Sequence, residues 1–168
     1  AKPEILAKLK GKFSTNGRAL NAAMTQSLDE NVGRIISKLK ELNLFDNTLI
    51  VFANDNGGQT VNSFADNFPL RGKKGDIYEG GIRVPLAMMW KNHIPSGVIN
   101  NEIVTTLDLI PTFLTAANVK SIPNILEGKS LLAVDGKKAT PLKNRTHFWF
   151  LGNNTGAIRQ GDWKLIVI

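Results

Sequence analysis

Residues 48–58 read Thr-Leu-Ile-Val-Phe-Ala-Asn-Asp-Asn-Gly-Gly, and this stretch decides the fold. Its first half is an apolar run rich in β-branched side chains, which is typical of a strand buried on both faces, as in a parallel sheet. The polar residues and glycines that follow end this strand abruptly. Ligands of open α/β sheets collect at the carboxyl ends of such strands, so residues 54–58 are the first place to look for a site.

The segments on either side of this strand predict an α/β fold. Over about residues 18–42, apolar residues recur at steps of three and four, which predicts one face of an amphipathic helix. A helix followed by a buried strand is the element order of an α/β fold. Downstream, residues 84–90 predict a second buried strand and residues 103–105 a short one. Asp108 predicts the N-cap of a helix that runs to about Ala117. The last strands, short and antiparallel, are predicted at 146–151, 156–159 and 163–168.

The composition limits the classes of site and partner. The chain has 168 residues, no cysteine and a net charge of +7. Disulfides, zinc thiolate sites and thiol nucleophiles are therefore excluded within these residues. No apolar run approaches the roughly 20 residues that span a bilayer. There is also no basic stripe with interleaved aromatic residues, so no nucleic-acid partner is expected. The positive charge gathers within residues 1–18, as on a solvated face, and at most aids the attraction of anionic substrates.

The segment that follows the first strand offers candidate metal ligands. Asp55 and Asn56 carry the hard oxygen atoms that Ca²⁺ or Mg²⁺ prefers. The two glycines after them would let the backbone come close to a bound group. Asn-Gly is also a strong turn dipeptide, so a simple turn is the alternative interpretation.

The long loop over residues 59–83 offers a candidate anion contact. Lys73 and Lys74 stand among glycines, and a lysine there presents a compact positive charge to a phosphate or sulfate oxygen. A flexible basic loop is the alternative. His93 is interpreted as part of a surface turn, and His147 as a structural residue. The sequence offers no Ser/His/Asp catalytic triad.

Taken in order, these segments resemble the sulfatase family of the alkaline-phosphatase-like superfamily. The third matching motif reads Lys-Gly-x-x-Tyr-Glu-Gly-Gly-Ile-Arg-Val-Pro over residues 74–85. Each motif alone is weak, but five in this order are specific. The resemblance covers about residues 20–168, and its motifs lie at residues 22–35, 46–58, 70–85, 107–112 and 159–165.

The resemblance implies a fold and an activity. The fold would be a mixed, mostly parallel sheet flanked by helices. Residues 1–144 would supply its C-terminal part, with an active-site loop at 54–83, and residues 145–168 would begin a small antiparallel subdomain. The activity would be hydrolysis of a sulfate ester at a site holding one divalent ion, usually Ca²⁺, with Mg²⁺ as the alternative. Such enzymes work mostly in the periplasm, in lysosomes or outside the cell, which favours a periplasmic or secreted location.

The resemblance also assigns roles to individual residues. Asp55 and Asn56 match the second Asp-Asn pair of metal ligands in the family. Lys74 matches the lysine that holds the sulfate group. Glu79-Gly80-Gly81 is interpreted as loop architecture rather than as part of the catalytic machinery.

The chain departs from the family at the nucleophile. That residue is a formylglycine made from Cys or Ser in the motif Cys/Ser-x-Pro-x-Arg, which lies N-terminal to the five motifs. Residues 67–71 have the Pro-x-Arg spacing, but Asn67 stands where the nucleophile would be, and we interpret this match as a coincidence. We therefore expect the C-terminal portion of a sulfatase, inactive by itself, with its formylglycine upstream. Two alternatives stay open, namely a phosphate or phosphonate ester hydrolase of the same superfamily and a non-enzymatic binding or structural module.

Overall fold

The computed structural model describes residues 1–121, 123–132, 142 and 145–168. It divides into two compact units, Ala1–Asn92 and His93–Ile168, and each is described by itself. The predicted subdomain boundary after residue 144 stays a prediction. Among the described residues, no helix combines the length and the apolar character needed to cross a membrane.

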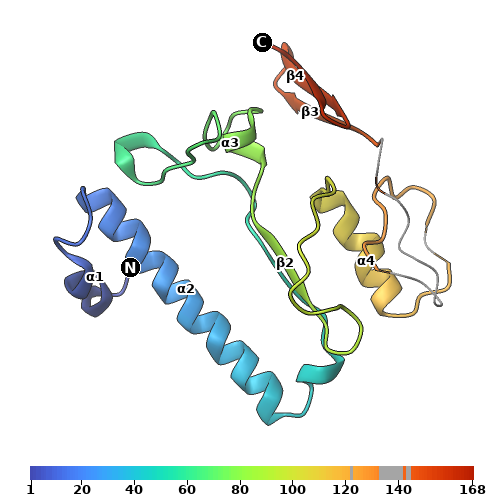
Figure 1. Cartoon of the computed structure of the whole chain (residues 1–168), viewed down its shortest axis with the longest axis horizontal. Helices are drawn as coiled ribbons and strands as arrows, with labels where there is room; N and C mark the ends of the chain where they lie inside the picture. Colours follow the sequence, from blue (N-terminus) through green and yellow to red (C-terminus); the bar gives the residue numbers. More distant parts are fainter. Residues whose placement is uncertain (122, 133–141, 143–144) are drawn as a thin grey trace. The chain divides into compact units, whose positions relative to one another are not determined.

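Two helices open the first unit. The predicted long helix is confirmed as α2 (Asn16–Glu41), and it begins at residue 16 because the Thr15 side chain caps it by accepting a hydrogen bond from Arg18 N at 3.2 Å. A short helix, α1 (Pro3–Leu9), lies beside α2 (Figure 1). An exposed ion pair of 2.9 Å between Lys2 and Glu30 joins the two helices.

The two strands of the first unit form an antiparallel pair, and the mostly parallel sheet expected from the sequence is not seen among the described residues. After η1 (Phe45–Asn47), the chain enters β1 (Ile50–Ala53), which pairs with β2 (Leu86–Met89) in antiparallel register (Figure 1). No parallel pair forms among the described residues. The intervening chain folds back at the carboxyl end of β1 and enters β2 from that same end, whereas a parallel partner needs a crossover to the other end. Neither strand is buried on both faces in this unit.

The segment between these strands carries the candidate site. It contains only η2 (Val61–Ser63) and the one-turn helix α3 (Glu79–Ile82), in agreement with the predicted loop. The mixed helix and strand content of the chain, with small antiparallel sheets, is that of an α/β protein.

The second unit ends in an antiparallel sheet, as predicted. Its strands β3 (Thr146–Leu151), β4 (Thr155–Gln160) and β5 (Trp163–Val167) pair in sequence order. Figure 1 labels β3 and β4 near the C-terminus. Before them come η3 (Thr106–Asp108) and α4 (Leu109–Ala116), so the predicted helix is confirmed. The short strand predicted at residues 103–105 is not formed. The loop predicted over 120–144 falls partly outside the described residues.

Candidate functional site

Asp55 and Asn56 lie where the sequence predicted them, directly after β1. Asp55 is exposed and Asn56 is half-buried. The Asp55 Oδ1 atom accepts hydrogen bonds from the backbone N and the side-chain Nδ2 of Asn56, both at 2.9 Å. Among the described residues, Asp55 Oδ2 and Asn56 Oδ1 take part in no hydrogen bond. Each side chain therefore keeps one oxygen free for a hard cation, which fits Ca²⁺ or Mg²⁺.

Asp55 and Asn56 alone would be too few to hold a calcium ion. A calcium ion takes six to eight oxygen ligands. Among the described residues there is no group of three or more acidic or histidine side chains close enough to hold a metal. The arrangement can supply two ligands of a larger set.

Gly57, the first glycine after Asn56, packs closely against α3. Gly57 N donates a hydrogen bond of 2.8 Å to Gly81 O, and a Cβ atom at Gly57 would overlap the carbonyl oxygen of Gly80. The backbone at Gly57 thus closely approaches α3 of the same chain. For Gly80 and Gly81, close packing supports the interpretation of Glu79-Gly80-Gly81 as loop architecture, because a Cβ atom at either glycine would also overlap a backbone carbonyl oxygen.

Lys74 lies in a loop that is hydrogen-bonded to the segment after Asn56. Its backbone N donates to Gly58 O at 3.2 Å, so the candidate ligand segment and the candidate sulfate-binding lysine come from neighbouring backbone. Asp76 shapes this loop by accepting a hydrogen bond from Lys73 N at 2.9 Å. Lys74 itself is exposed and forms no ion pair with the described residues. Its ammonium group is therefore available to an anion.

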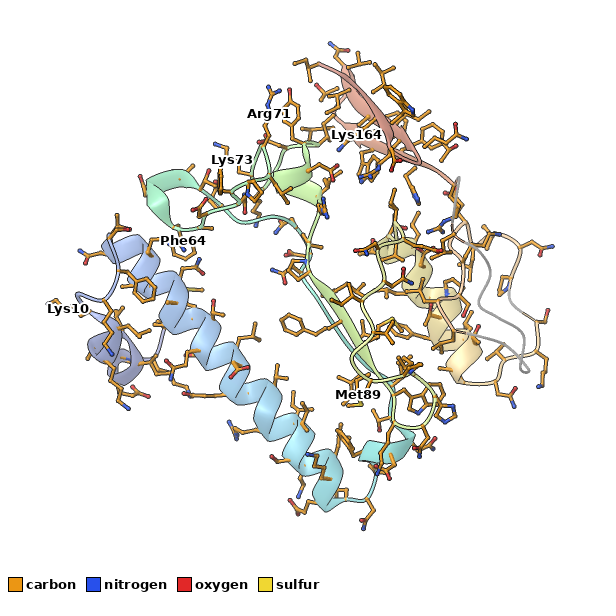
Figure 2. The ribbon with its side chains drawn as sticks, viewed as in Figure 1. Lys10, Phe64, Arg71, Lys73, Met89 and Lys164 are labelled. Carbon is orange, nitrogen blue, oxygen red and sulfur yellow. The ribbon has the colours of Figure 1, made fainter. Side chains whose placement is uncertain are left out.

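Arg71 is a further cation on this loop that the sequence did not single out. Its guanidinium lies over the Tyr78 ring at 3.9 Å from the ring centroid, which is a cation–π contact. Its carbonyl oxygen accepts from Gly80 N at 2.7 Å. Figure 2 labels Arg71 and Lys73 on this stretch, just before α3.

Asn67 was also missed, because the sequence shows only its mismatch to the nucleophile motif. Its side-chain Oδ1 accepts from Gly58 N at 3.0 Å, and its Nδ2 donates to Gly58 O at 2.9 Å and to Gly72 O at 3.0 Å. One amide thus joins the loop after β1 to the loop that carries Lys74. Sequence spacing gives no signal for such a contact.

In the second unit, Asp108 stands at the predicted N-cap position of α4, but its side chain caps no N–H of that helix and is instead a buried anchor. The cap of η3 is Thr105, and Asp108 completes its capping box by accepting from Thr105 N at 2.9 Å. The fully buried Asp108 carboxylate also accepts from Arg145 Nη1 at 2.7 Å, Arg145 Nη2 at 2.8 Å and Lys129 N at 2.8 Å. Burial alone would raise the pKa of Asp108, but these donors outweigh it and hold the pKa below its ordinary value.

A small cavity of about 290 Å³ lies beside this ion pair, lined in part by Arg145, His147 and Trp149 of the second unit. His147 and Trp149 are two positions apart in β3 and so share one face of the strand, and Arg145 directly precedes it. Burial, with a smaller contribution from Arg145, lowers the pKa of His147, which favours its neutral form. This agrees with the structural role predicted for His147.

Two family models match the chain. The model described as "Sulfatase" matches residues 7–119. A second, described as "N-sulphoglucosamine sulphohydrolase, C-terminal", matches residues 73–167. Together they cover the loop between β1 and β2 and the C-terminal sheet.

Curated relatives agree with these models. An N-acetylgalactosamine-6-sulfatase of Sus scrofa is 31% identical over 161 residues, which are 90% of this chain and 30% of that protein. The uncharacterized sulfatase YdeN of Escherichia coli is 37% identical over 128 residues, 74% of this chain and 22% of its own length.

Solved structures have the same fold. The crystal structure of Ps i-CgsB in complex with k-i-k-neocarrahexaose superposes with a TM-score of 0.88 at 35% identity, over 100% of this chain and 38% of the other. The crystal structure of the PsFucS1 sulfatase from Pseudoalteromonas sp. superposes with a TM-score of 0.73 at 27% identity. The match covers 96% of this chain and 32% of the other chain. The chain thus spans about a third of the length of these relatives.

Proposed function

Because the chain belongs to the sulfatase family, we propose that residues 54–83 supply part of the active site of a sulfuric ester hydrolase. One observation carries the proposal, namely the hydrogen bond from Lys74 N to Gly58 O. It places the lysine loop against the segment that begins with Asp55 and Asn56. Since the chain matches about a third of its relatives' length, the activity is proposed for the full-length protein.

In this proposal Asp55 and Asn56 are two ligands of one divalent ion, Ca²⁺ or Mg²⁺. Their free oxygens, Asp55 Oδ2 and Asn56 Oδ1, are of the type that hard cations bind. When bound, the ion polarises the oxygens of the sulfuryl group. Further ligands come from parts of the sulfatase outside this chain, because the described residues hold no larger acidic group.

Lys74 holds the sulfate group of the substrate. Its ammonium is a compact cation with three donors, and it offsets negative charge on the sulfuryl oxygens as the ester bond breaks. The hydrogen bonds that fix the loop leave this side chain exposed, so it can reach an ester bound beside the metal ligands. The nucleophile is a formylglycine contributed from outside these residues, so the isolated chain is inactive.

The family resemblance also leads to a proposal about the fold of the full-length protein. We propose that β1 and β2 join a larger, mostly parallel sheet whose other strands come from the rest of the sulfatase. The side chain of Phe52 in β1 is 43% exposed in this chain, and an added sheet neighbour or layer would bury it.

The test is the replacement Lys74→Ala in the full-length sulfatase that contains these residues. Turnover of 4-methylumbelliferyl sulfate, or of a sulfated saccharide where the aryl ester is not cleaved, should fall about 10²-fold to 10³-fold, as for loss of a charge-stabilising donor. The matched control is Lys73→Ala, which removes the same charge from the adjacent position and should change turnover less than about threefold. Equal effects of the two replacements would remove Lys74 from the site.

A further inference from the structure

The Asn67 side chain uses three of its hydrogen-bonding positions on two different loops. Its Oδ1 accepts from Gly58 N at 3.0 Å, while its Nδ2 donates to Gly58 O at 2.9 Å and to Gly72 O at 3.0 Å. The geometry depends on glycine at position 58, where a Cβ atom would come within 2.8 Å of Asn67 Oδ1. The amide and the glycine therefore fit each other as a pair.

The two loops are those that carry the proposed site residues. Gly58 follows Asn56 by two positions, and Gly72 precedes Lys74 by two positions. The carbonyl oxygen of Gly58 accepts from both Asn67 Nδ2 and Lys74 N, at 2.9 Å and 3.2 Å. The Gly58 carbonyl oxygen therefore joins the segment of the proposed metal ligands to the lysine loop. The Asn67 amide donates to this same oxygen.

We propose that Asn67 is a positioning residue that sets the spacing between the metal ligands Asp55 and Asn56 and the sulfate-binding Lys74. This inference rests on the proposed function. A misplacement of about 1 Å in such a site can cost 10²-fold in rate. Loss of a group that orients metal ligands typically costs 10-fold to 100-fold in metal affinity.

Only an amide of this length meets the three contacts at once. The site needs one acceptor for Gly58 N and two donors for the carbonyl oxygens of Gly58 and Gly72. An ionised aspartate keeps the acceptor but turns a second oxygen toward two carbonyl oxygens, which repels them. A protonated aspartate restores one of the two donors. Asn67→Asp is therefore a variant whose defect should depend on pH.

The first arm of the experiment measures Ca²⁺ affinity by titration calorimetry and turnover of 4-methylumbelliferyl sulfate in the full-length sulfatase. Asn67→Ala should weaken Ca²⁺ binding and lower turnover, each by about 10-fold to 100-fold. The matched control is Asn21→Ala, which loses a side-chain hydrogen bond of 2.8 Å to Phe64 O, in the same unit but with no bond to Gly58 or Gly72. The control should stay within about twofold of the wild type.

The second arm separates positioning from general stability. In a Lys74→Ala background, Asn67→Ala should lower turnover much less than in the wild type, because the lysine it positions is gone. The activity of Asn67→Asp relative to wild type should rise as the pH falls toward about 4, where its carboxyl group takes up a proton. A purely structural role predicts the same loss in both backgrounds and no such recovery.

The outcomes distinguish this inference from the function on which it rests. A wild type that neither binds Ca²⁺ nor cleaves a sulfate ester overturns the proposed function, and the inference with it. An active wild type in which Asn67→Ala behaves like Asn21→Ala overturns the inference alone. If Asn67→Ala does not fold, Asn67→Asp decides, since the absence of any acid recovery contradicts the role of the amide donors.

Discussion

The ion pair between Asp108 and Arg145 should dominate the stability of the second unit, and Arg145→Ala tests this. Asp108 is fully buried, and the Arg145 side chain is only 17% exposed. The replacement removes two of the four hydrogen bonds to the carboxylate and leaves those from Thr105 N and Lys129 N. Breaking a buried pair by removing one partner costs about 3–5 kcal/mol.

The structure places the expected loss at the lower end of that range. Because two backbone N–H donors still reach the carboxylate, Arg145→Ala should lower the free energy of unfolding by about 3 kcal/mol, or more than 100-fold in the folding equilibrium. The assay is urea denaturation followed by tryptophan fluorescence, since Trp149 and Trp163 lie in the sheet that begins next to Arg145.

A matched control is available in the first unit. Lys91→Ala breaks an ion pair of 2.6 Å with Asp46, but both side chains are more than half exposed, so the loss should be less than about 1 kcal/mol. If Arg145→Ala and Lys91→Ala destabilise the protein equally, the reasoning on the buried pair is refuted.

The ion pair between Asp108 and Arg145 also determines how stability changes at acid pH. The pKa of Asp108 is held below its ordinary value of 3.8 in the folded state. Its contribution to stability is therefore fully present above about pH 4 and is lost as the pH falls below 3.8 through the folded value. Arg145→Ala should weaken this dependence, and a series of urea titrations at acid pH measures it.

Two further predictions follow from close packing and from the buried imidazole. Gly57→Ala should destabilise the first unit and lower turnover, because its Cβ would overlap the Gly80 carbonyl oxygen, whereas Gly33→Ala, in a helix with open space around it, should raise the melting temperature slightly. Comparable melting shifts for both variants would contradict the predicted overlap. The lowered pKa of His147 predicts that stability falls as the pH drops below 6.5 and that His147→Gln removes this dependence. An NMR titration of the imidazole that gives a pKa at or above 6.5 would rule this out.

Local pattern was sufficient for the elements and for the order of the motifs. The 3.6-residue repeat predicted α2 to within two residues at either end, because a helical face is set by neighbours three and four positions apart. Turn residues between short apolar runs likewise predicted the three strands of the C-terminal sheet. The placement of Asp55, Asn56 and Lys74 in one loop region also followed from the sequence.

Contacts between residues far apart in the chain were not predictable in this way. The apolar run of β1 is compatible with parallel or antiparallel pairing, and only the return path of the chain made β2 antiparallel. Asp108 reads as a helix cap locally, yet its principal partner, Arg145, lies 37 residues away. Asn67 has no local signature for its bonds to Gly58 and Gly72.

By itself, therefore, the sequence predicted most of the helices and strands and pointed to Asp55, Asn56 and Lys74 as candidate site residues. The tertiary structure alone decided how those side chains are held. A hydrogen bond such as that from Lys74 N to Gly58 O forms only when folding has brought two loops within about 3 Å. Local propensity acts over a few residues, whereas the spacing of a binding site is set by backbone groups that meet only in the folded chain.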